Sequence, residues 1–233
     1  MNIAIIAAAG AGTRLASDRP KQFLLLAGTP VIIHTLKVFE QCESIHEVIV
    51  VLPAAESAGF LSLAGKHGLR KVARVVPGGV TRADSVKRGL LAIRAATAAI
   101  VAVHDGVRPF VTREEIESTV ALAQTDGAAI LVAPVTDTVK QISDGRVVRS
   151  LDRGELRRAL TPQCFRYELL REAFVNADVN DPSLTDESAL VEQLGHPISV
   201  IEGSARNIKI TTAEDLAIAG AMLTAHVTDW NRD

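Results

Sequence analysis

Residues 2–14 read NIAIIAAAGAGTR, an apolar run followed by a loop of small residues. The first half is an apolar run typical of a strand that is covered on both faces of a sheet. The second half is alanine and glycine followed by Arg14, which predicts a loop whose backbone can approach a ligand closely. Successive exposed N–H groups in such a loop form a concavity for anionic oxygen, so we expect a phosphate-bearing ligand here.

Apolar runs of the same kind alternate with helical patterns as far as residue 132. We expect strands at 2–8, 47–52, 72–76, 99–103 and 128–132, and helices at 30–42, 54–66, 81–95 and 112–125. Pro30 suits a first helical turn, and Thr112 with Glu115 has the spacing of a capping box. This alternation predicts an α/β fold with a mostly parallel, twisted sheet and helices on both faces, in which ligands bind beyond the carboxyl ends of the strands.

The alternation breaks after Pro134. Residues 135–153, VTDTVKQISDGRVVRSLDR, form two polar, alternating runs around Ser143, Asp144 and Gly145, which predicts a projecting β-hairpin arm. A projecting ribbon commonly finds its partner in a second subunit. Helices near 166–177, 185–194 and 212–226 and a strand at 197–202 are expected to complete a single domain of residues 1–233.

Composition excludes several classes of protein. The 233 residues are 48% hydrophobic and 22% charged, as in ordinary globular chains. With 25 Lys and Arg against 27 Asp and Glu, the chain has no cationic field for a nucleic-acid backbone. Cys42 and Cys164 are too few for a disulfide framework, which favours the cytoplasm. No apolar stretch is long enough for a membrane span, and no basic residue precedes the first run, as it would in a secretory leader.

The loop after the first strand leaves two interpretations open, a nucleotide site or a structural turn with a solvated Arg14. A dinucleotide site is disfavoured because Leu15 occupies the position of the third glycine in G-x-G-x-x-G, and no P-loop pattern occurs. Lys21, in Pro20-Lys21-Gln22, adds a second cation close to the loop.

Two further segments carry candidate functional residues. The segment His104-Asp105-Gly106-Val107-Arg108-Pro109 follows an expected strand, where a carboxylate can meet substrate hydroxyls or a magnesium phosphate. A capped turn with a surface arginine is the alternative. The glycines at 78 and 79 precede a helix that offers its N-terminus and the hydroxyls of Thr81 and Ser85 to an anion. Here the alternative is an ordinary β-to-α turn.

Together these segments resemble one family over nearly the whole chain. The motifs that carry the resemblance are AAGAGTR at 8–14, PKQF at 20–23, RADSV at 82–86, HDGVRP at 104–109, DTVK at 137–140, LTPQ at 160–163, TDE at 185–187 and NIK at 207–209. Their order is that of the 2-C-methyl-D-erythritol 4-phosphate cytidylyltransferases of the non-mevalonate isoprenoid pathway. The resemblance implies a Rossmann-like nucleotidyltransferase that uses CTP and Mg²⁺ to form 4-diphosphocytidyl-2-C-methyl-D-erythritol and diphosphate.

The resemblance also implies roles for individual residues. The implied catalytic residues are Arg14, Lys21, Arg153 and Lys209. The implied nucleotide-binding residues are Ala8, Ala9, Gly10, Gly12, Gly79 and Ser85. The implied residues for the sugar-alcohol phosphate are Asp105, Arg108, Thr138 and Thr185. Mg²⁺ would be held mainly by the triphosphate, with Asp105 as the one candidate side-chain ligand. A homodimer is implied in which Thr138 and Arg153, both on the 135–153 arm, act in the neighbouring subunit's site.

Three other functions remain open at this level. The related ribitol-5-phosphate cytidylyltransferases share the arm and CTP but usually have Gly-Gly where this chain has Ala9-Gly10. A nicotinamide oxidoreductase is disfavoured by Arg14 and Leu15. A non-catalytic nucleotide-binding module is the third, and Arg14→Ala separates it from an enzyme, because a transition-state role of Arg14 predicts a larger loss of turnover than of CTP affinity. Two departures from the family pattern occur, Ala7 in place of proline and Val80 at a position that is often acidic.

Overall fold

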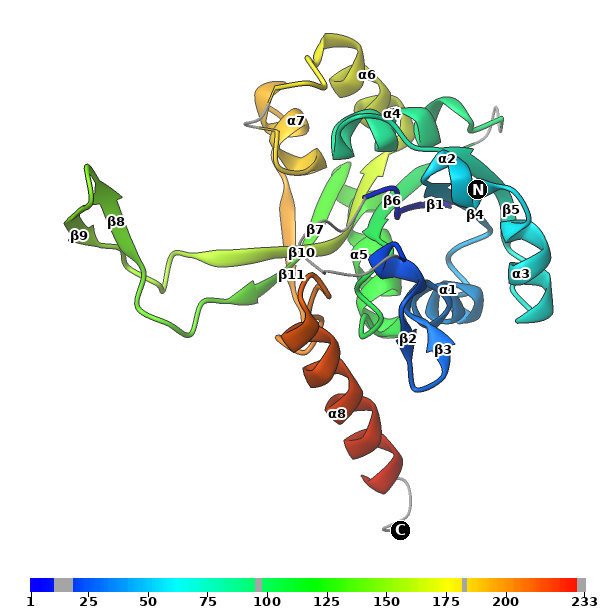
Figure 1. The fold of residues 1–233 in the computed structure, drawn as a ribbon. Helices are drawn as coiled ribbons and strands as arrows, with labels where there is room; N and C mark the ends of the chain where they lie inside the picture. The colour runs from blue at the N-terminus through cyan, green and yellow to red at the C-terminus, as the bar shows by residue number, and fades with distance from the viewer. Residues whose placement is uncertain (11–18, 95–97, 182–183, 230–233) are drawn as a thin grey trace.

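The fold is that of a computed structural model, which describes residues 1–10, 19–94, 98–181 and 184–229 (Figure 1). The central sheet contains seven strands: β1 (Ile3–Ala7), β4 (Glu47–Leu52), β5 (Val72–Pro77), β6 (Ile100–Asp105), β7 (Ala128–Pro134), β10 (Arg157–Arg166) and β11 (Ser199–Glu202). Their order is β11-β7-β10-β6-β1-β4-β5, and only β10 runs antiparallel to its neighbours. The mostly parallel sheet expected from the sequence is therefore confirmed.

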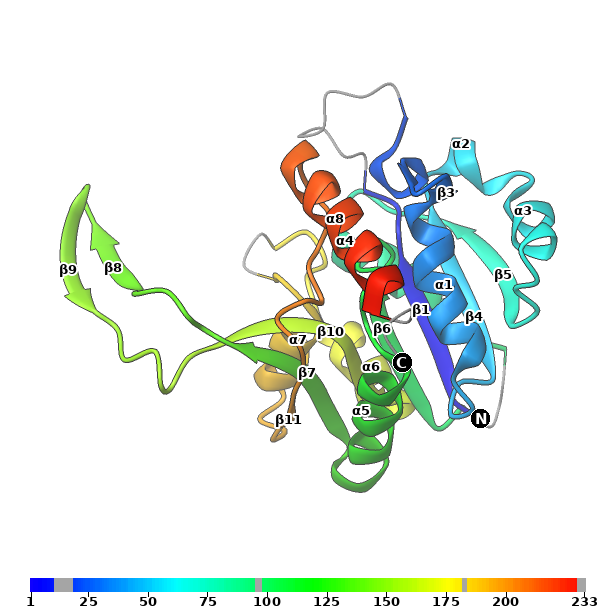
Figure 2. The same cartoon turned by 90° about the horizontal axis from the view of Figure 1, so that it is seen from below.

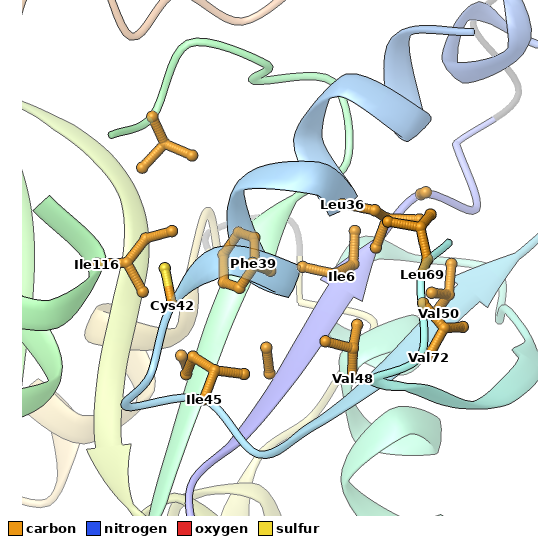
Figure 3. Packing of buried hydrophobic residues seen from close by; sticks show 14 of the residues in the cluster. Ile6, Leu36, Phe39, Cys42, Ile45, Val48, Val50, Leu69, Val72 and Ile116 are labelled. Carbon is orange, nitrogen blue, oxygen red and sulfur yellow. The ribbon is translucent and has the colours of Figure 1, made fainter. Parts of the chain in front are cut away.

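Helices cover both faces of this sheet because alternate strand residues point to opposite sides. One face carries α1 (Val31–Gln41), α3 (Phe60–Lys66) and α5 (Arg113–Asp126), and the other carries α4 (Arg82–Leu91), α6 (Tyr167–Asn176) and α7 (Glu187–Gln193). Ile6 of β1 packs in the cluster with Phe39 of α1 (Figure 3), whereas its neighbour Ile5 packs in the cluster with Val86 of α4. The capping box of Thr112 and Glu115 is present at the start of α5.

Two segments of the chain differ from the sequence-based expectation. The single helix expected at 54–66 is two helices, α2 (Ala54–Ser57) and α3, because Gly59 adopts a left-handed φ of 82° between them. No strand was expected over 157–166, where the structure has β10, and this segment contains Pro162, a residue that the middle of a sheet rarely accommodates. In the structure, the register with β7 shifts between Ala159 and Gln163, and Pro162 lies within this irregular stretch, where a strand tolerates proline.

The 135–153 arm is a β-hairpin, as expected. Its strands β8 (Lys140–Ser143) and β9 (Arg146–Ser150) pair antiparallel, and the turn between them has positive φ at Asp144 and Gly145, as a tight hairpin turn requires. The arm stands away from the sheet in both views (Figures 1 and 2). It exposes three apolar side chains, Ile142, Val147 and Val148.

The remaining elements lie beside the sheet. They are η1 (Lys21–Phe23), the short pair β2 (Leu25–Leu26) and β3 (Thr29–Pro30), and the C-terminal helix α8 (Ala213–Asp229). Ala219 of α8 joins a small core with Leu26 and Val107, which brings the C-terminal helix against the N-terminal half of the chain. Across the ranges that the structure describes, no helix combines the length and apolar character needed to cross a membrane.

Candidate active site

A cavity of about 350 Å³ lies at the carboxyl ends of β1 and β6. Within the sheet, β4 lies on one side of β1 and β6 lies on the other, so the strand order reverses at β1. The cavity is therefore at the switch point where α/β sheets bind ligands. Its described lining residues are Ala7, Ala8, Ala9, Gly10, Lys21, Gln22, Gly79, Val80, Thr81, Arg82, Ser85, Asp105, Val107 and Lys209.

The loop after β1 is held against its neighbours through backbone groups. Ala8 donates its N–H to the carbonyl of Val51 at 2.9 Å, and its own carbonyl accepts from the side-chain amide of Gln22 at 2.6 Å. Gly106 donates to the carbonyl of Ala7, and a Cβ at Gly106 would lie 2.8 Å from that of Ala8. Small residues are therefore required here because the ends of β1 and β6 touch.

The backbone N–H groups of the loop between β5 and α4 donate to acceptors within the protein. The N–H groups of Gly78, Gly79 and Val80 donate to the carbonyl of Leu52, the hydroxyl of Ser85 and the carboxylate of Asp84, at 2.7, 3.0 and 3.1 Å. These three groups are therefore not offered to a ligand phosphate. The loop instead forms an uncharged wall beside the small residues of the β1 loop.

Gly79→Ala is expected to raise the KM for the nucleotide that the family resemblance implies about tenfold, with little change in the KM for the second implied substrate. The reason is steric, because a Cβ at Gly79 collides with the Asp84 side chain that fixes this loop. Steady-state kinetics with each substrate varied in turn measures both constants. Gly65→Ala, in α3 where a Cβ meets nothing within 4 Å, is the matched control. An unchanged KM for that nucleotide in Gly79→Ala would contradict this prediction.

The opposite side of the cavity is charged. Asp105, at the end of β6, faces three cationic side chains: Arg82 Nε lies 3.1 Å from Oδ1, and Lys209 Nζ and Arg108 Nε lie 3.0 and 3.3 Å from Oδ2. Although burial alone would raise the pKa of Asp105, these cations hold it well below the usual range, so the carboxylate is ionised. Arg108 is held in turn by the carbonyl of Asn207 at 2.8 Å.

His104 is hydrogen-bonded to residues next to this cluster through both of its ring nitrogens. Nε2 lies 3.2 Å from the carbonyl of Arg108, which can only accept, so Nε2 carries the proton. Nδ1 therefore accepts from the Thr161 hydroxyl at 3.0 Å, and that hydroxyl oxygen accepts from the backbone N–H of Asp105 at 3.2 Å. His104 is completely buried and both of its ring nitrogens are hydrogen-bonded within the protein, so its role is to fix the backbone around Asp105.

Acid is expected to destabilise the protein through His104. Burial lowers its pKa from 6.5 to about 4, so the folded state binds fewer protons than the unfolded state between these values. His104 does not lower the free energy of unfolding above pH 6.5, and it lowers this free energy progressively as the pH falls from 6.5 towards 4. We expect the free energy of unfolding in urea to drop by about 2 kcal/mol from pH 7 to pH 5, and less in His104→Gln. The same drop in both proteins would contradict the prediction.

The structure brings many of the sequence-predicted site residues together. Those that line the cavity are Ala8, Ala9, Gly10, Lys21, Gly79, Ser85, Asp105 and Lys209. Arg108 touches Asp105 directly. Thr138, Arg153 and Thr185 are exposed and are not among the residues that line the cavity. Arg14 and Gly12 lie outside the described residues, and so does Leu15.

Two site residues were missed at the sequence level. Arg82 lines the cavity and pairs with Asp105, and the buried Glu187 pairs with Arg82. Both lie inside motifs that the sequence analysis singled out, at 82–86 and 185–187, but nothing in the sequence shows that two residues so far apart touch. A charged residue at the start of each of two helices was the only signal.

The side chains that line the cavity offer few ligands for a divalent cation. Asp105 is the one carboxylate among the described lining residues, and both of its oxygens face cations. Among the residues that the structure describes, no group of three His, Cys, Asp or Glu side chains converges. This site fits Mg²⁺ held mainly by ligand phosphates and water, the usual mode for that ion, and does not fit an all-protein cage.

The fold and this cavity define an α/β enzyme of the nucleotidyltransferase class. The family model described as 2-C-methyl-D-erythritol 4-phosphate cytidylyltransferase (IspD) matches residues 2–225. The chain belongs to this family.

Individual relatives agree with the family match. The chain is 45% identical to the 2-C-methyl-D-erythritol 4-phosphate cytidylyltransferase of Pelotomaculum thermopropionicum, over 95% of this chain and 94% of that protein. It is 44% identical to the enzyme of the same name from Syntrophotalea carbinolica, over 94% of each. The crystal structure of 4-diphosphocytidyl-2C-methyl-D-erythritol synthase from Anaerococcus prevotii superposes with a TM-score of 0.83 at 30% identity, over 96% of each chain.

Proposed function

We propose that the cavity binds CTP beside 2-C-methyl-D-erythritol 4-phosphate and transfers CMP to the latter. A phosphate oxygen of the sugar-alcohol phosphate attacks the α-phosphorus of CTP, a new P–O bond forms, the bond to the β-phosphate breaks, and diphosphate leaves. The observation that carries the proposal is the division of one cavity into an uncharged wall of small residues and a cationic cluster around Asp105.

The uncharged wall suits the nucleoside part of CTP. Gly10, Gly79 and Ser85 lie on it together with Ala8 and Ala9, and their small side chains let a flat base and a ribose lie against backbone. Thr81 caps α4 through its hydroxyl, which accepts from the Asp84 N–H at 3.0 Å and keeps the loop before α4 in place.

The charged wall suits the sugar-alcohol phosphate. The ionised Asp105 accepts hydrogen bonds from substrate hydroxyls, and Arg108 and Lys209 counter the charge of the phosphate. A phosphate monoester has a second pKa of about 6, so it is largely ionised at neutral pH and needs no general base. The chain's task is positioning and neutralisation of charge, and Lys21 together with Arg14 would supply the latter at the reacting phosphorus.

Mg²⁺ belongs to the same proposal. When bound, the ion neutralises charge on the triphosphate and on the departing diphosphate. Because Asp105 is already held by three cationic side chains, the chain's contribution to the metal is to place the phosphates that carry it. We expect chelation of divalent cations to abolish turnover and added Mg²⁺ to restore it.

Diphosphate release tests the activity. We expect release from CTP with 2-C-methyl-D-erythritol 4-phosphate, and none with ATP, GTP or UTP in place of CTP. Product with D-ribitol 5-phosphate alone would instead support the ribitol alternative. CTP binding with no turnover on either acceptor would support the non-catalytic module.

The arm leads us to propose a homodimer with shared sites. Thr138 and Arg153 are exposed at the base of the arm, with the apolar Ile142, Val147 and Val148 beyond them. Exposed apolar side chains on an otherwise polar ribbon favour a covered position in an assembly.

A heterodimer of two inactive variants tests the shared site. A dimer purified with one Lys21→Met subunit and one Arg153→Met subunit is expected to recover about half of the wild-type activity, because one of its two sites then contains neither defect. Each variant homodimer is expected to be nearly inactive. No recovery in the heterodimer would show that each arm serves its own subunit.

We also propose a cytoplasmic location. Both Cys42 and Cys164 are buried free thiols, and burial raises the pKa of the Cys42 thiol to about 12, as for packing residues in a reducing compartment. Fractionation of cells that express a tagged chain tests this assignment.

A further inference from the structure

Arg82 is tied to two carboxylates from distant parts of the chain. It is the first residue of α4 and lines the cavity. Its Nε donates to Oδ1 of Asp105 at 3.1 Å, and its Nη1 lies 2.7 and 2.8 Å from the two carboxylate oxygens of Glu187. The Glu187 side chain is only 1% exposed, whereas that of Arg82 is 26% exposed, so the carboxylate of this ion pair is enclosed by protein and the guanidinium borders the cavity.

Glu187 is itself fixed by the antiparallel strand β10. It is the first residue of α7, and its N–H and that of Ser188 both donate to the amide oxygen of Gln163 at 3.1 Å. Gln163 lies fully buried on β10, and its amide nitrogen donates to Asp186, the residue that caps α7. The start of α7 is therefore anchored to β10 before its carboxylate reaches Arg82.

The charges favour a positioning role over direct phosphate binding. Burial raises the pKa of Glu187, and the Arg82 guanidinium offsets part of that rise. Conversely, although burial alone would lower the pKa of Arg82, Glu187 and Asp105 together raise it above its usual value. The charge of Arg82 is therefore balanced by two carboxylates of the protein, those of Glu187 and Asp105. Lys209 and Arg108, in contrast, share one oxygen of Asp105, its Oδ2.

We propose that Arg82 is a positioning residue for the acceptor half of the site, holding Asp105 in the orientation that substrate hydroxyls require while Glu187 holds Arg82. The inference rests on the proposed function. It links the motifs at 82–86, 160–163 and 185–187 in one contact chain that runs from β10 through α7 and α4 to the end of β6.

Three variants test this role. Arg82→Met combined with Glu187→Leu replaces the ion pair by apolar side chains of similar size, so that no unpaired charge remains to unfold the protein. Arg82→Lys keeps the positive charge without the planar fork. Arg113→Lys is the matched control, because Arg113 also begins a helix and also pairs with two carboxylates, Glu117 and Glu43, but is exposed and is not among the residues that line the cavity.

The expected result is a split between the two substrates. In the double variant we expect the KM for the sugar-alcohol phosphate to rise about tenfold and the KM for CTP to change less than about twofold. Arg82→Lys is expected to lie between the double variant and the wild type, and Arg113→Lys to match the wild type. Equal rises of both KM values, or a lower thermal midpoint with both KM values unchanged, would show a merely structural ion pair and overturn the inference.

A crystal structure of the double variant gives a readout that does not depend on turnover. We expect Asp105 to leave its present side-chain orientation once the Arg82 donor is gone. An Asp105 that keeps its orientation would overturn the inference, whatever the enzyme acts on. A wild-type protein that forms no product from the two proposed substrates would instead contradict the proposed function, so the two failures are distinguishable.

Discussion

Lys21→Met is expected to lower kcat by about 100-fold or more while the KM for CTP changes by less than about threefold. Lys21 begins the short helix η1 and lines the cavity, half-buried. The next residue, Gln22, is anchored to the carbonyl of Ala8, so the lysine stem is fixed relative to the loop after β1. A cation held there acts on charge that develops only as the new bond to phosphorus forms, which is why turnover suffers more than binding.

Single-turnover and steady-state kinetics measure this effect. Methionine keeps the unbranched apolar stem of lysine, so the substitution removes charge with little change in packing. Lys66→Met, at the exposed end of α3, is the control and should behave as the wild type. Parallel losses in CTP affinity and in kcat would assign Lys21 to ground-state binding.

Asp105→Asn is the second change with a large expected effect. We expect kcat/KM for the sugar-alcohol phosphate to fall about 100-fold, with the KM for CTP nearly unchanged. Asparagine keeps the shape of the side chain but leaves Lys209 and Arg108 facing an uncharged amide. Because these charges then lack their buried partner, the free energy of unfolding should also fall, by about 3 kcal/mol.

Two measurements separate these effects. Urea unfolding gives the stability, and kinetics below the unfolding transition gives kcat/KM for each substrate. Glu117→Gln, which removes a carboxylate from the exposed pair with Arg113, is the control and should cost less than about 1 kcal/mol with no kinetic effect. A loss of stability with wild-type kinetics would remove Asp105 from the acceptor site.

The Rossmann-like fold was predictable because its signals are local. Buried parallel strands require continuous apolar runs, and the runs at 2–8, 47–52 and 128–132 predicted β1, β4 and β7 closely. The arm was equally local, because its turn residues and alternating polar pattern fix a hairpin without any distant partner. The strand β10 was not predictable, because Pro162 contradicts a central strand unless the neighbouring strands accommodate an irregular register.

The residues at the ends of β1 and β6 were likewise open to prediction, since chemistry gathers where strands of an α/β sheet end. By itself, the sequence determined the layered α/β fold, the projecting hairpin and the small, charged and hydroxyl residues that line one edge of the sheet. Only the tertiary structure decided that Arg82 and the buried Glu187, 105 residues apart, form an ion pair beside Asp105. The physical reason is that hydrophobic periodicity is written along the chain, whereas the partner of a buried charge depends on which distant helix ends the packed sheet brings together.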